Sequence, residues 1–535
     1  MKIKKLLVTL PLAAIALAAM SGCGAKRNKF AYDLDFNVDV SGQTINMWTG
    51  FGTDLSDRVE ELLAEFKKLT GVTVNYESKS SYDGCLKAVN LAATSVKYPH
   101  VVVGYPDHFA SYVKSNIIVR LDYYFENDVH NSTFEPEGES FKISDFYADY
   151  MAENQSIEFD KDGNPYTLGV PFNKSTEVLI YNKTFFDYCA SNDELKTKIF
   201  VPTTYDELES VGTNILGYFD KLGLYGKTLY EDGSVGTAQS GKKVILDLTG
   251  ITKADGTNKK SQFKPFSYDS QANLFITSTR QAGGTYTEID KQTRKGYLAF
   301  NNQTTVDSLT YLKGLYDKNV FGIPADWDEA KYGSNPFKAS KTVMTLGSSA
   351  GVANSAPAGN KFEIAAAPVP YRTADKKFVI SQGANLALLD TGTREQRVAA
   401  WQLIKFLSKY ANGAFCAESG YYPSCAYAEI AGADGHSGMW ANAGDDFDDY
   451  ATWLSEAQES MNSATRIRAQ TAEVNLNHYV NADEHWIKFV DAPFSGSAQI
   501  RNEVAAITPW VFRGEYTPQG AIDAIYAKLS TYVRK

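Results

Sequence analysis

The pentapeptide GSSAG at positions 347–351 is the stretch of this sequence that comes nearest to an enzyme signature. It fits the G-x-S-x-G pattern, in which a serine on a sharp turn after a strand acts as a nucleophile, here Ser349. The strand-like TVMTL precedes it, and His436, His478 and His485 follow, so the chain order permits a triad. The alternative is a strand end whose hydroxyl and N–H groups face a cleft. We favour this alternative and keep an esterase as a remote possibility.

Two further motifs resemble sites of phosphate or metal chemistry. GTAQSGKK at 236–243 resembles a P-loop, but Lys243 replaces the Ser or Thr that holds magnesium, and the strand-like VILDL follows instead of a helix. DKDGNP at 160–165 resembles half a calcium loop, but Pro165 stands where that loop needs Gly. The sequence contains no CxxC or HExxH pattern. We therefore expect no catalytic residue, no metal site and no cofactor.

The N-terminus predicts export. MKIKK is followed by the mostly apolar LLVTLPLAAIALAAM and then by SGC, an arrangement typical of a signal peptide and too short for a membrane span. Cys23 follows a triplet similar to a lipobox, with Met20 departing from the usual Leu, so we expect a lipoprotein signal over 1–23 and acylation of Cys23. Simple secretion is the alternative. The polar residues 24–42 are expected to form a tether, which places the protein at the outer face of the cytoplasmic membrane or in the periplasm.

The composition limits the partners. With 535 residues the chain exceeds a single core, and two or three domains are expected. Its net charge of −10 argues against nucleic acid, which is bound by a surplus of Lys and Arg. The 33 tyrosines suit a site that stacks on sugar rings. Cys416 and Cys425 are close enough in sequence to close a small loop, and whether they pair stays open.

Apolar spacing predicts alternating strands and helices. Strand-like residues 44–48 precede a helix over 54–71 with an apolar stripe, and a second strand follows at 72–78. Strand, helix and strand in this order form the unit of a parallel α/β sheet. Further helices are expected over 394–410 and over 517–533, where Thr517 and Pro518 suit the first turn.

The segment YTLGVPFNKSTEVLIYNKTFF at 166–186 carries a family resemblance. Together with VPTTYDELESV at 201–211, it resembles extracellular solute-binding proteins of ABC importers, of the sugar type. PFNKSTEVLIYNK is most similar to the glycerol-3-phosphate-binding proteins of that family. The likeness covers most of the mature chain from about residue 45 to the final helix. It omits residues 224–262, which we expect to be an inserted surface hairpin.

The resemblance implies a set of ligand residues. A family glutamate falls at Pro106, beside Asp107, and the other positions keep the family's residue type. An arginine offers a planar fork of donors to a phosphate, serines can donate to further oxygens, and tyrosines offer flat faces with a polar tip. The implied ligand-binding residues are Tyr82, Asp107, Ser175, Ser348, Gly383, Tyr421 and Arg501.

The resemblance also implies an architecture and a function. The fold is expected to be a two-lobed, periplasmic-binding-protein-like α/β fold with a hinge and a ligand cleft between the lobes. One lobe would hold residues 43–170 and 360–393, and the other 171–359 and 394–535. The protein would be a monomer, not an enzyme, that captures glycerol-3-phosphate or a glycerophosphodiester and delivers it to permease subunits. An oligosaccharide is the alternative ligand, favoured if Arg501 points away from the cleft.

Overall fold

A computed structural model describes most of the chain, namely residues 32–95, 97–128, 132–135, 141–237, 241–255, 259–290, 292–293, 295–330, 332–425, 450–480, 482–529 and 533. The predicted signal peptide and Cys23 lie outside these residues, so lipidation stays a prediction. In the described part, no helix is both long and apolar enough to cross a membrane. The same part holds no group of three or more His, Cys, Asp and Glu placed to bind a metal ion.

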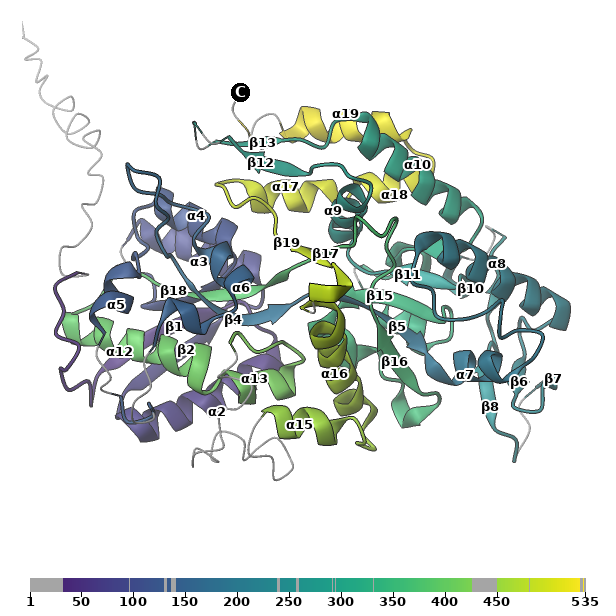
Figure 1. The fold of residues 1–535 in the computed structure, drawn as a ribbon, viewed down its shortest axis with the longest axis horizontal. Coiled ribbons are helices and arrows are strands. Elements are labelled where there is room, and N and C mark those ends of the chain that lie inside the picture. The colour runs from purple at the N-terminus through teal and green to yellow at the C-terminus, as the bar shows by residue number, and fades with distance from the viewer. Residues whose placement is uncertain are drawn as a thin grey trace, which may run out of the picture.

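The described chain folds into two α/β lobes that lie side by side in Figure 1, as predicted. The first lobe, at the left of that view, contains a five-stranded sheet in the order β2-β1-β3-β18-β4. β1, β2 and β3 run parallel, and β18 pairs antiparallel with both β3 and β4. The elements of this lobe up to the first crossing, with β18, are β1 (Thr44–Thr49), α2 (Thr53–Thr70), β2 (Thr73–Ser78), α3 (Tyr82–Ala93), β3 (Val101–Gly104), α4 (Pro106–Lys114), α5 (Asp122–Asn127), α6 (Ala148–Asn154), β4 (Val170–Ser175) and β18 (Gln382–Leu388).

The second lobe is built on a sheet in the order β14-β11-β15-β5-β16. Its main elements are β5 (Glu177–Asn182), α7 (Lys183–Ser191), α8 (Tyr205–Leu222), β11 (Phe266–Tyr268), α9 (Gln271–Gln281), α10 (Gln303–Asp317), β14 (Phe321–Gly322), α11 (Ser334–Lys338), β15 (Met344–Ser348) and β16 (Ile364–Ala367). The later part of the chain adds α15 (Tyr450–Ala457), α16 (Ser463–Val474), α17 (Ser497–Val504), α18 (Ile507–Phe512) and α19 (Pro518–Leu529), and two short pairs, β12 (Thr287–Ile289) with β13 (Gly296–Leu298) and β17 (Phe378–Ile380) with β19 (Ile487–Phe489).

The predicted helix over 54–71 shows how the sequence specifies its elements. α2 buries the stripe formed by Val59, Leu62, Leu63 and Phe66 against the first sheet. It ends at Gly71, whose φ of 73° lies in the left-handed region that glycine adopts without strain. The neighbouring strands β1 and β2 then pair in parallel, as the strand–helix–strand pattern predicts.

Three chain connections join the lobes. β4 ends at Ser175 in the first sheet and β5 begins at Glu177 in the second, so Thr176 is the single residue between them. The second connection runs from β17 through Ser381 into β18. The third is α16, which packs Ala469 in the first core and Ile467 in the second; before it, after α13 (Asn412–Ser419), Tyr422 forms an isolated bridge with Lys174. The hydrogen-bonding residues of PFNKST therefore lie where the chain passes from one lobe to the other.

The lobes differ from the predicted boundaries at two places. β16 lies within the predicted first-lobe segment 360–393, but it pairs with β5 in the second sheet. The helix α12 (Arg394–Lys405) and α13 were assigned to the second lobe, but they pack in the core of the first. The cause is the apolar face of α12, which includes Val398 and Trp401 and covers the first sheet. Trp453 of α15 still packs in the first core, and the chain reaches the second core at Ile467 of α16.

Two further segments also differ from expectation. The described part of the predicted tether, 32–42, packs on the first lobe. Phe36 and Val40 are buried there, and the ring centroids of Phe36 and Tyr124 are 5.6 Å apart. The predicted surface hairpin at 224–262 is a small three-stranded sheet of β6 (Thr228–Tyr230), β7 (Val235–Gly236) and β8 (Val244–Asp247), followed by the pair β9 (Thr252–Lys253) and β10 (Gln262–Phe263). Buried apolar residues of this insertion join the core of the second lobe.

Cys416 and Cys425 are two buried thiols in this structure and not a disulfide. Both belong to the first core, in which α13 lies against α2. Asp160 organises the turn at 160–165 by accepting hydrogen bonds from Asp162 and Asn164, which is turn chemistry and not calcium binding.

Candidate functional site

The carboxyl ends of β1, β2 and β3 lie at the junction between the lobes, and each is followed by the N-terminus of a helix. Tyr82 is the first residue of α3, whose N-cap Ser81 accepts a hydrogen bond from Gly84 N at 3.0 Å. Asp107 lies in the first turn of α4 and accepts from the backbone N–H of His108 at 2.9 Å. Helix N-termini carry partial positive charge, so they favour the Asp107 carboxylate and polar ligand groups.

Three tyrosines gather at this junction. The rings of Tyr82 and Tyr105 meet edge to face with centroids 4.8 Å apart, and the Tyr82 hydroxyl accepts from Asn173 Nδ2 at 2.8 Å. Tyr421 hydrogen-bonds with Tyr82 and Asn173, and its ring stacks on Phe415 at 5.9 Å. Burial raises the pKa of the Tyr82 hydroxyl, and the neighbouring Tyr421 and Tyr105 raise it further. The cluster therefore stays neutral and offers hydroxyl groups beside aromatic rings.

Ser175, Ser348 and Gly383 lie on the strands that cross or border the junction. Ser175 ends β4 and is paired in register with Gln382, while Ser348 ends β15 opposite Glu177. Gly383 has a φ of 94°, and a Cβ built on it would lie 1.9 Å from the carbonyl oxygen of Asn173. Close packing of β18 on β4 therefore requires a glycine here, whatever the ligand.

Arg501 projects from α17 and is already hydrogen-bonded within the protein. Its Nη1 pairs with Asp491 Oδ2 and its Nη2 donates to Asn273 Oδ1. Burial would lower the pKa of the Arg501 guanidinium, but the charge of Asp491, helped by Tyr105, raises it overall. Asp107 of the first lobe contributes in the same direction, so its charge acts on the guanidinium across the junction.

Asn273 extends this network to the crossing strands. Its Nδ2 donates to Glu177 Oε1 at 2.8 Å and to Gln382 Oε1 at 2.9 Å. Glu177 Oε2 accepts from the Tyr268 hydroxyl at 2.6 Å. Burial raises the pKa of Glu177, and these two hydrogen bonds and the charge of Arg501 partly oppose the shift. Arg501 is thereby linked to the first residues of both β5 and β18.

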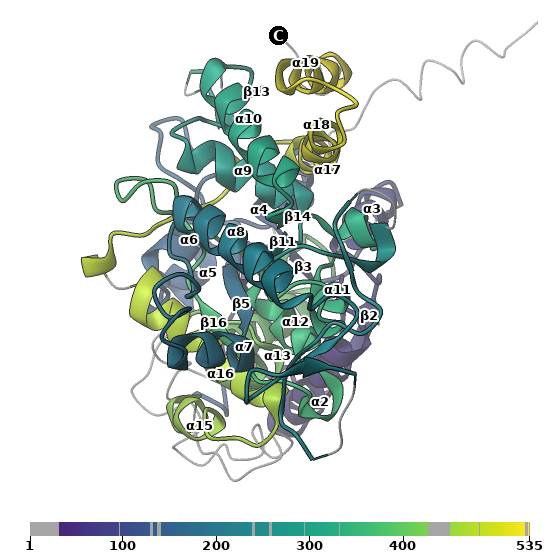
Figure 2. The ribbon, with the colours of Figure 1, turned by 90° about the vertical axis from the view of Figure 1, so that its right-hand side faces the viewer.

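Helix α17 brings the second lobe against the first. It lies beside α4, as Figures 1 and 2 show from two directions. Ala498 packs in an apolar cluster with Phe109 of the first lobe, and Asn502 Nδ2 donates to Asp83 Oδ2 at 3.1 Å. The lobes therefore meet on the side that carries Tyr82, Asp107 and Arg501.

Comparison with known proteins identifies the family. Residues 61–443 match the model of the family described as bacterial extracellular solute-binding protein, which is well over half of the chain. The chain belongs to this family. As a solute-binding protein it serves an ABC importer and is not an enzyme. A search of curated proteins found no match.

Solved structures of solute-binding proteins share the fold. An ABC substrate-binding protein from Listeria monocytogenes, in complex with cycloalternan, is 14% identical with a TM-score of 0.60, covering 92% of this chain and 98% of its own. The cyclic α-maltosyl-1,6-maltose-binding protein from Arthrobacter globiformis is 17% identical with a TM-score of 0.57, covering 91% and 98%. UgpB from Mycobacterium tuberculosis, in complex with glycerophosphocholine, is 17% identical with a TM-score of 0.60, covering 92% and 98%. At this identity the likeness establishes the fold alone.

Ser349 is part of the lobe crossing of this solute-binding protein. Its Oγ accepts from the backbone N–H of Thr176 at 3.2 Å and contacts the Tyr422 hydroxyl, and its own N–H donates to Thr176 O at 2.8 Å. Within the described chain these contacts involve no histidine. His478 instead lies 3.8 Å from Glu484. His436 lies outside the described residues, and it is the membership of the solute-binding family that rules out the esterase alternative.

Four residues of the network were not predicted from the sequence: Tyr105, Asn273, Asp491 and Glu177. Tyr105 could have been found, because it directly follows the buried strand β3 at the sheet edge where the other site residues lie. Asp491 and Asn273 lie in a loop and a helix with no distinguishing pattern, and only the fold brings them to Arg501.

Two hollows lie away from these residues. One of about 50 Å³ lies between the lobes and is lined mainly by Tyr147, Tyr150, Tyr422 and residues of α16 and the turn after it. The other, a shallower groove of about 430 Å³, lies on the first lobe beside α5. Neither is lined by a predicted ligand residue. We place the site by its hydrogen-bonding network and its position between the strand ends, where solutes bind in open α/β sheets.

Proposed function

We propose that this solute-binding protein captures an uncharged carbohydrate between its lobes. The proposal rests on the hydrogen bonds of Arg501, whose guanidinium already donates to Asp491 and Asn273 within the protein. Asp107 and Glu177 add negative charge around it. A phosphate would have to compete with Asp491 and approach further carboxylates, whereas a neutral ligand meets neither cost.

Unused hydrogen-bonding capacity supports the same ligand class. The buried Oδ1 atoms of Asn173 and Asp491 have no hydrogen-bond partner among the described residues. Both atoms are acceptors and need a donor. A sugar has many hydroxyl groups that can donate, whereas glycerol-3-phosphate has two, beside a phosphate dianion that only accepts. The tyrosine faces of Tyr82, Tyr105 and Tyr421 would cover the apolar side of a sugar ring.

Similarity offers further support. The related structures from Listeria and Arthrobacter are described as binding cycloalternan and cyclic α-maltosyl-1,6-maltose, both of which are uncharged carbohydrates. We extend this ligand class, not the particular sugars, to the present chain. The proposed partners are permease subunits and, through an acylated Cys23, the membrane. We propose that the exported protein works as a monomer.

Glycerol-3-phosphate or a glycerophosphodiester is the second candidate. It is favoured by the position of Arg501, whose guanidinium interacts electrostatically with Tyr105 and Asp107 of the opposite lobe. An arginine can bind a phosphate with two parallel hydrogen bonds. UgpB from Mycobacterium tuberculosis, which has the same fold, is described in complex with glycerophosphocholine. In this case Arg501 would exchange Asp491 for the ligand as the lobes close.

A thermal-shift panel tests the proposal. The purified protein is heated with maltotriose, cycloalternan, glycerol-3-phosphate and glycerophosphocholine in separate experiments. A ligand at a hundred times its Kd stabilises the folded state by about 2.7 kcal/mol, which raises Tm measurably. We expect a shift with a neutral carbohydrate and none with glycerol-3-phosphate. Shifts with the phosphate compounds alone would replace the first candidate by the second.

A further inference from the structure

Lys174 lies in the middle of the PFNKST segment and is completely buried at the junction. Its Nζ pairs with Glu153 Oε2 at 2.6 Å and donates to the carbonyl oxygen of Gly383 at 3.3 Å. Both partners come from other elements, Glu153 from α6 and Gly383 from β18. The side chain therefore ties the first crossing strand to two neighbours that are distant in sequence.

The contacts of Lys174 reach all three connections between the lobes. Its backbone is in register with Gly383 of the second connection, and its carbonyl oxygen accepts from Tyr422 N at 2.8 Å. The Tyr422 hydroxyl in turn donates to Thr471 O of α16, the third connection, at 3.3 Å. Glu153 completes the arrangement, since its Oε1 accepts from Ser381 Oγ at 2.9 Å. The ion pair thus ties β4 to the second connection, and the backbone of Lys174 adds a link to Tyr422.

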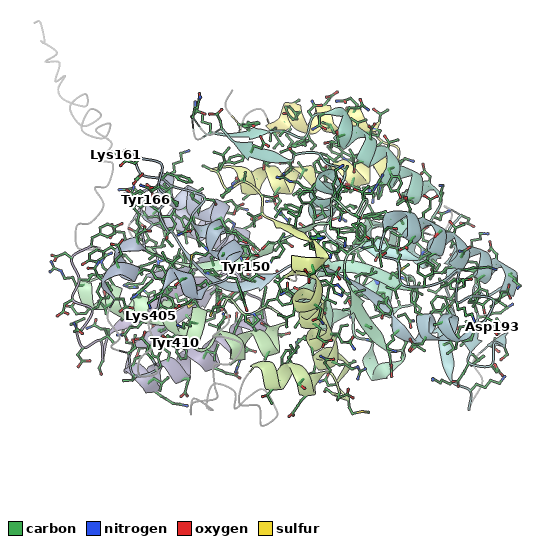
Figure 3. All side chains as sticks on the ribbon, viewed as in Figure 1. Tyr150, Lys161, Tyr166, Asp193, Lys405 and Tyr410 are labelled. Atoms are coloured by element: carbon green, nitrogen blue, oxygen red, sulfur yellow. The ribbon has the colours of Figure 1, made fainter. Side chains whose placement is uncertain are left out.

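An aromatic ring of α6 closes the site of this ion pair. The Lys174 ammonium lies 5.3 Å from the centre of the Tyr150 ring, and Lys488 of β19 lies 4.6 Å from the same centre. Figure 3 shows Tyr150 near the middle of the molecule, between the two lobes. The ring excludes water from the ammonium, which strengthens its directional contacts.

Stability does not explain this pair. Removing two charges from water is expensive, and replacing a buried ion pair by apolar residues of similar volume is often neutral or stabilising. What charged and hydrogen-bonded groups provide in addition is a fixed geometry, because their contacts tolerate little change in distance or angle. A junction between moving lobes is where such a constraint has a consequence for function.

We propose that Lys174 and Glu153 are positioning residues that fix the angle between the lobes by holding the first two connections, β4–β5 and β17–β18, in one arrangement. Three predicted ligand residues lie close to this ion pair. Ser175 follows Lys174 in the chain, and Gly383 is its partner in β18. Tyr421 precedes Tyr422, which forms a bridge with Lys174. The ion pair thereby sets the spacing of groups on the floor of the site. This role is separate from the identity of the ligand.

Distance measurements between spin labels test the proposal without a ligand. Labels are attached to Leu91→Cys on α3 and Asp193→Cys after α7, which are exposed by 75% and 95%. Figure 3 places Asp193 at the far end of the second lobe. Cys23→Ser is added to every variant, and the four described cysteines are buried, so labelling is confined to the new sites. Double electron–electron resonance then gives the distribution of interlobe distances.

The decisive variant is Lys174→Met/Glu153→Met, which replaces the ion pair by an apolar pair. We expect it to keep a Tm close to that of the wild type but to give a distance distribution about twofold broader, because the directional side-chain contacts between the two connections are lost and only the backbone hydrogen bonds remain. A distribution as narrow as that of the wild type would overturn the proposal. If this variant does not fold, Ser381→Ala decides: it removes one hydrogen bond to Glu153, and an unchanged width overturns the proposal equally.

A second buried ion pair supplies the control. Lys264 and Asp326 pair at 2.8 Å within the second lobe and are 2% and 3% exposed. Lys264→Met/Asp326→Met removes the same kind of interaction away from the connections and should leave the width unchanged. Equal broadening in both double variants would show a general loss of rigidity and contradict a positioning role for Lys174.

Discussion

Arg501 and Asp491 form an ion pair at the lobe junction, in which the two side chains are only 25% and 18% exposed. Burial raises the pKa of the Asp491 carboxyl, while Arg501 and then Arg280 lower it. An arginine paired in this way can bind a ligand anion only if its contact with the carboxylate is broken. The pairing therefore bears on which solutes the protein can accept.

Removing the charge of Asp491 should change that selectivity. In Asp491→Asn the charge of the Arg501 guanidinium is no longer balanced, so affinity for glycerol-3-phosphate, which the wild type should not detectably bind, should rise by at least about tenfold, or about 1.4 kcal/mol, and become measurable. Titration calorimetry of both proteins measures the change. Asp107→Asn is the comparison, because Asp107 has no direct contact with Arg501 and should give a smaller gain. Absence of measurable glycerol-3-phosphate binding by Asp491→Asn would contradict the prediction.

Gly383→Ala should destabilise the protein strongly. The new Cβ would lie 1.9 Å from Asn173 O in a backbone conformation that disfavours any side chain. Such strain costs about 1–3 kcal/mol before the clash is counted, and the melting temperature should fall accordingly. Gly217→Ala is the matched control, because its Cβ meets nothing within 4 Å in the middle of α8. That variant should be as stable as the wild type or slightly more stable.

Ser349→Ala should lower the free energy of unfolding and should not change any catalytic activity. The Thr176 N–H would lose its side-chain acceptor in a buried position, at a cost of about 1–3 kcal/mol by denaturant unfolding. Neither the wild type nor the variant should hydrolyse simple esters. Ester turnover by the wild type that disappears in Ser349→Ala would restore the enzyme alternative.

Cys23→Ala tests the predicted anchor. If Cys23 is acylated, the wild type should sediment with membranes, and the variant should remain soluble or keep its signal peptide. Cell fractionation with detection of the two forms measures this. Equal partitioning of both proteins into membranes would remove the lipoprotein prediction.

The local elements were predictable because their periodicity is complete in the sequence. The stripe of α2 and its neighbouring strands appear as expected. Apolar periodicity is also present in residues 32–42, which we expected to be a tether. There Tyr32, Leu34, Phe36, Val38 and Val40 alternate with polar residues. All five pack against the first core, although the segment forms no regular strand. Alternation there indicated attachment to a lobe and not a tether.

The lobe boundaries were harder to predict because they depend on tertiary packing. α12 is apolar enough to cover either sheet, and only the three-dimensional path of the chain places it on the first. The environment of Arg501 was also not predictable. Asn273 lies 228 residues before it in the sequence, and no local pattern joins the two. The family resemblance suggests Arg501 as a ligand residue, but it does not predict that Asp491 pairs with it.

Titration calorimetry of the wild-type protein tests the central claim most directly, using maltotriose, cycloalternan, glycerol-3-phosphate and glycerophosphocholine at the same pH and ionic strength. The occupied guanidinium of Arg501 and the two acceptors without donors predict binding to a neutral carbohydrate and no detectable heat with glycerol-3-phosphate. Tight binding of glycerol-3-phosphate, abolished by Arg501→Ala and absent for every carbohydrate, would contradict the account.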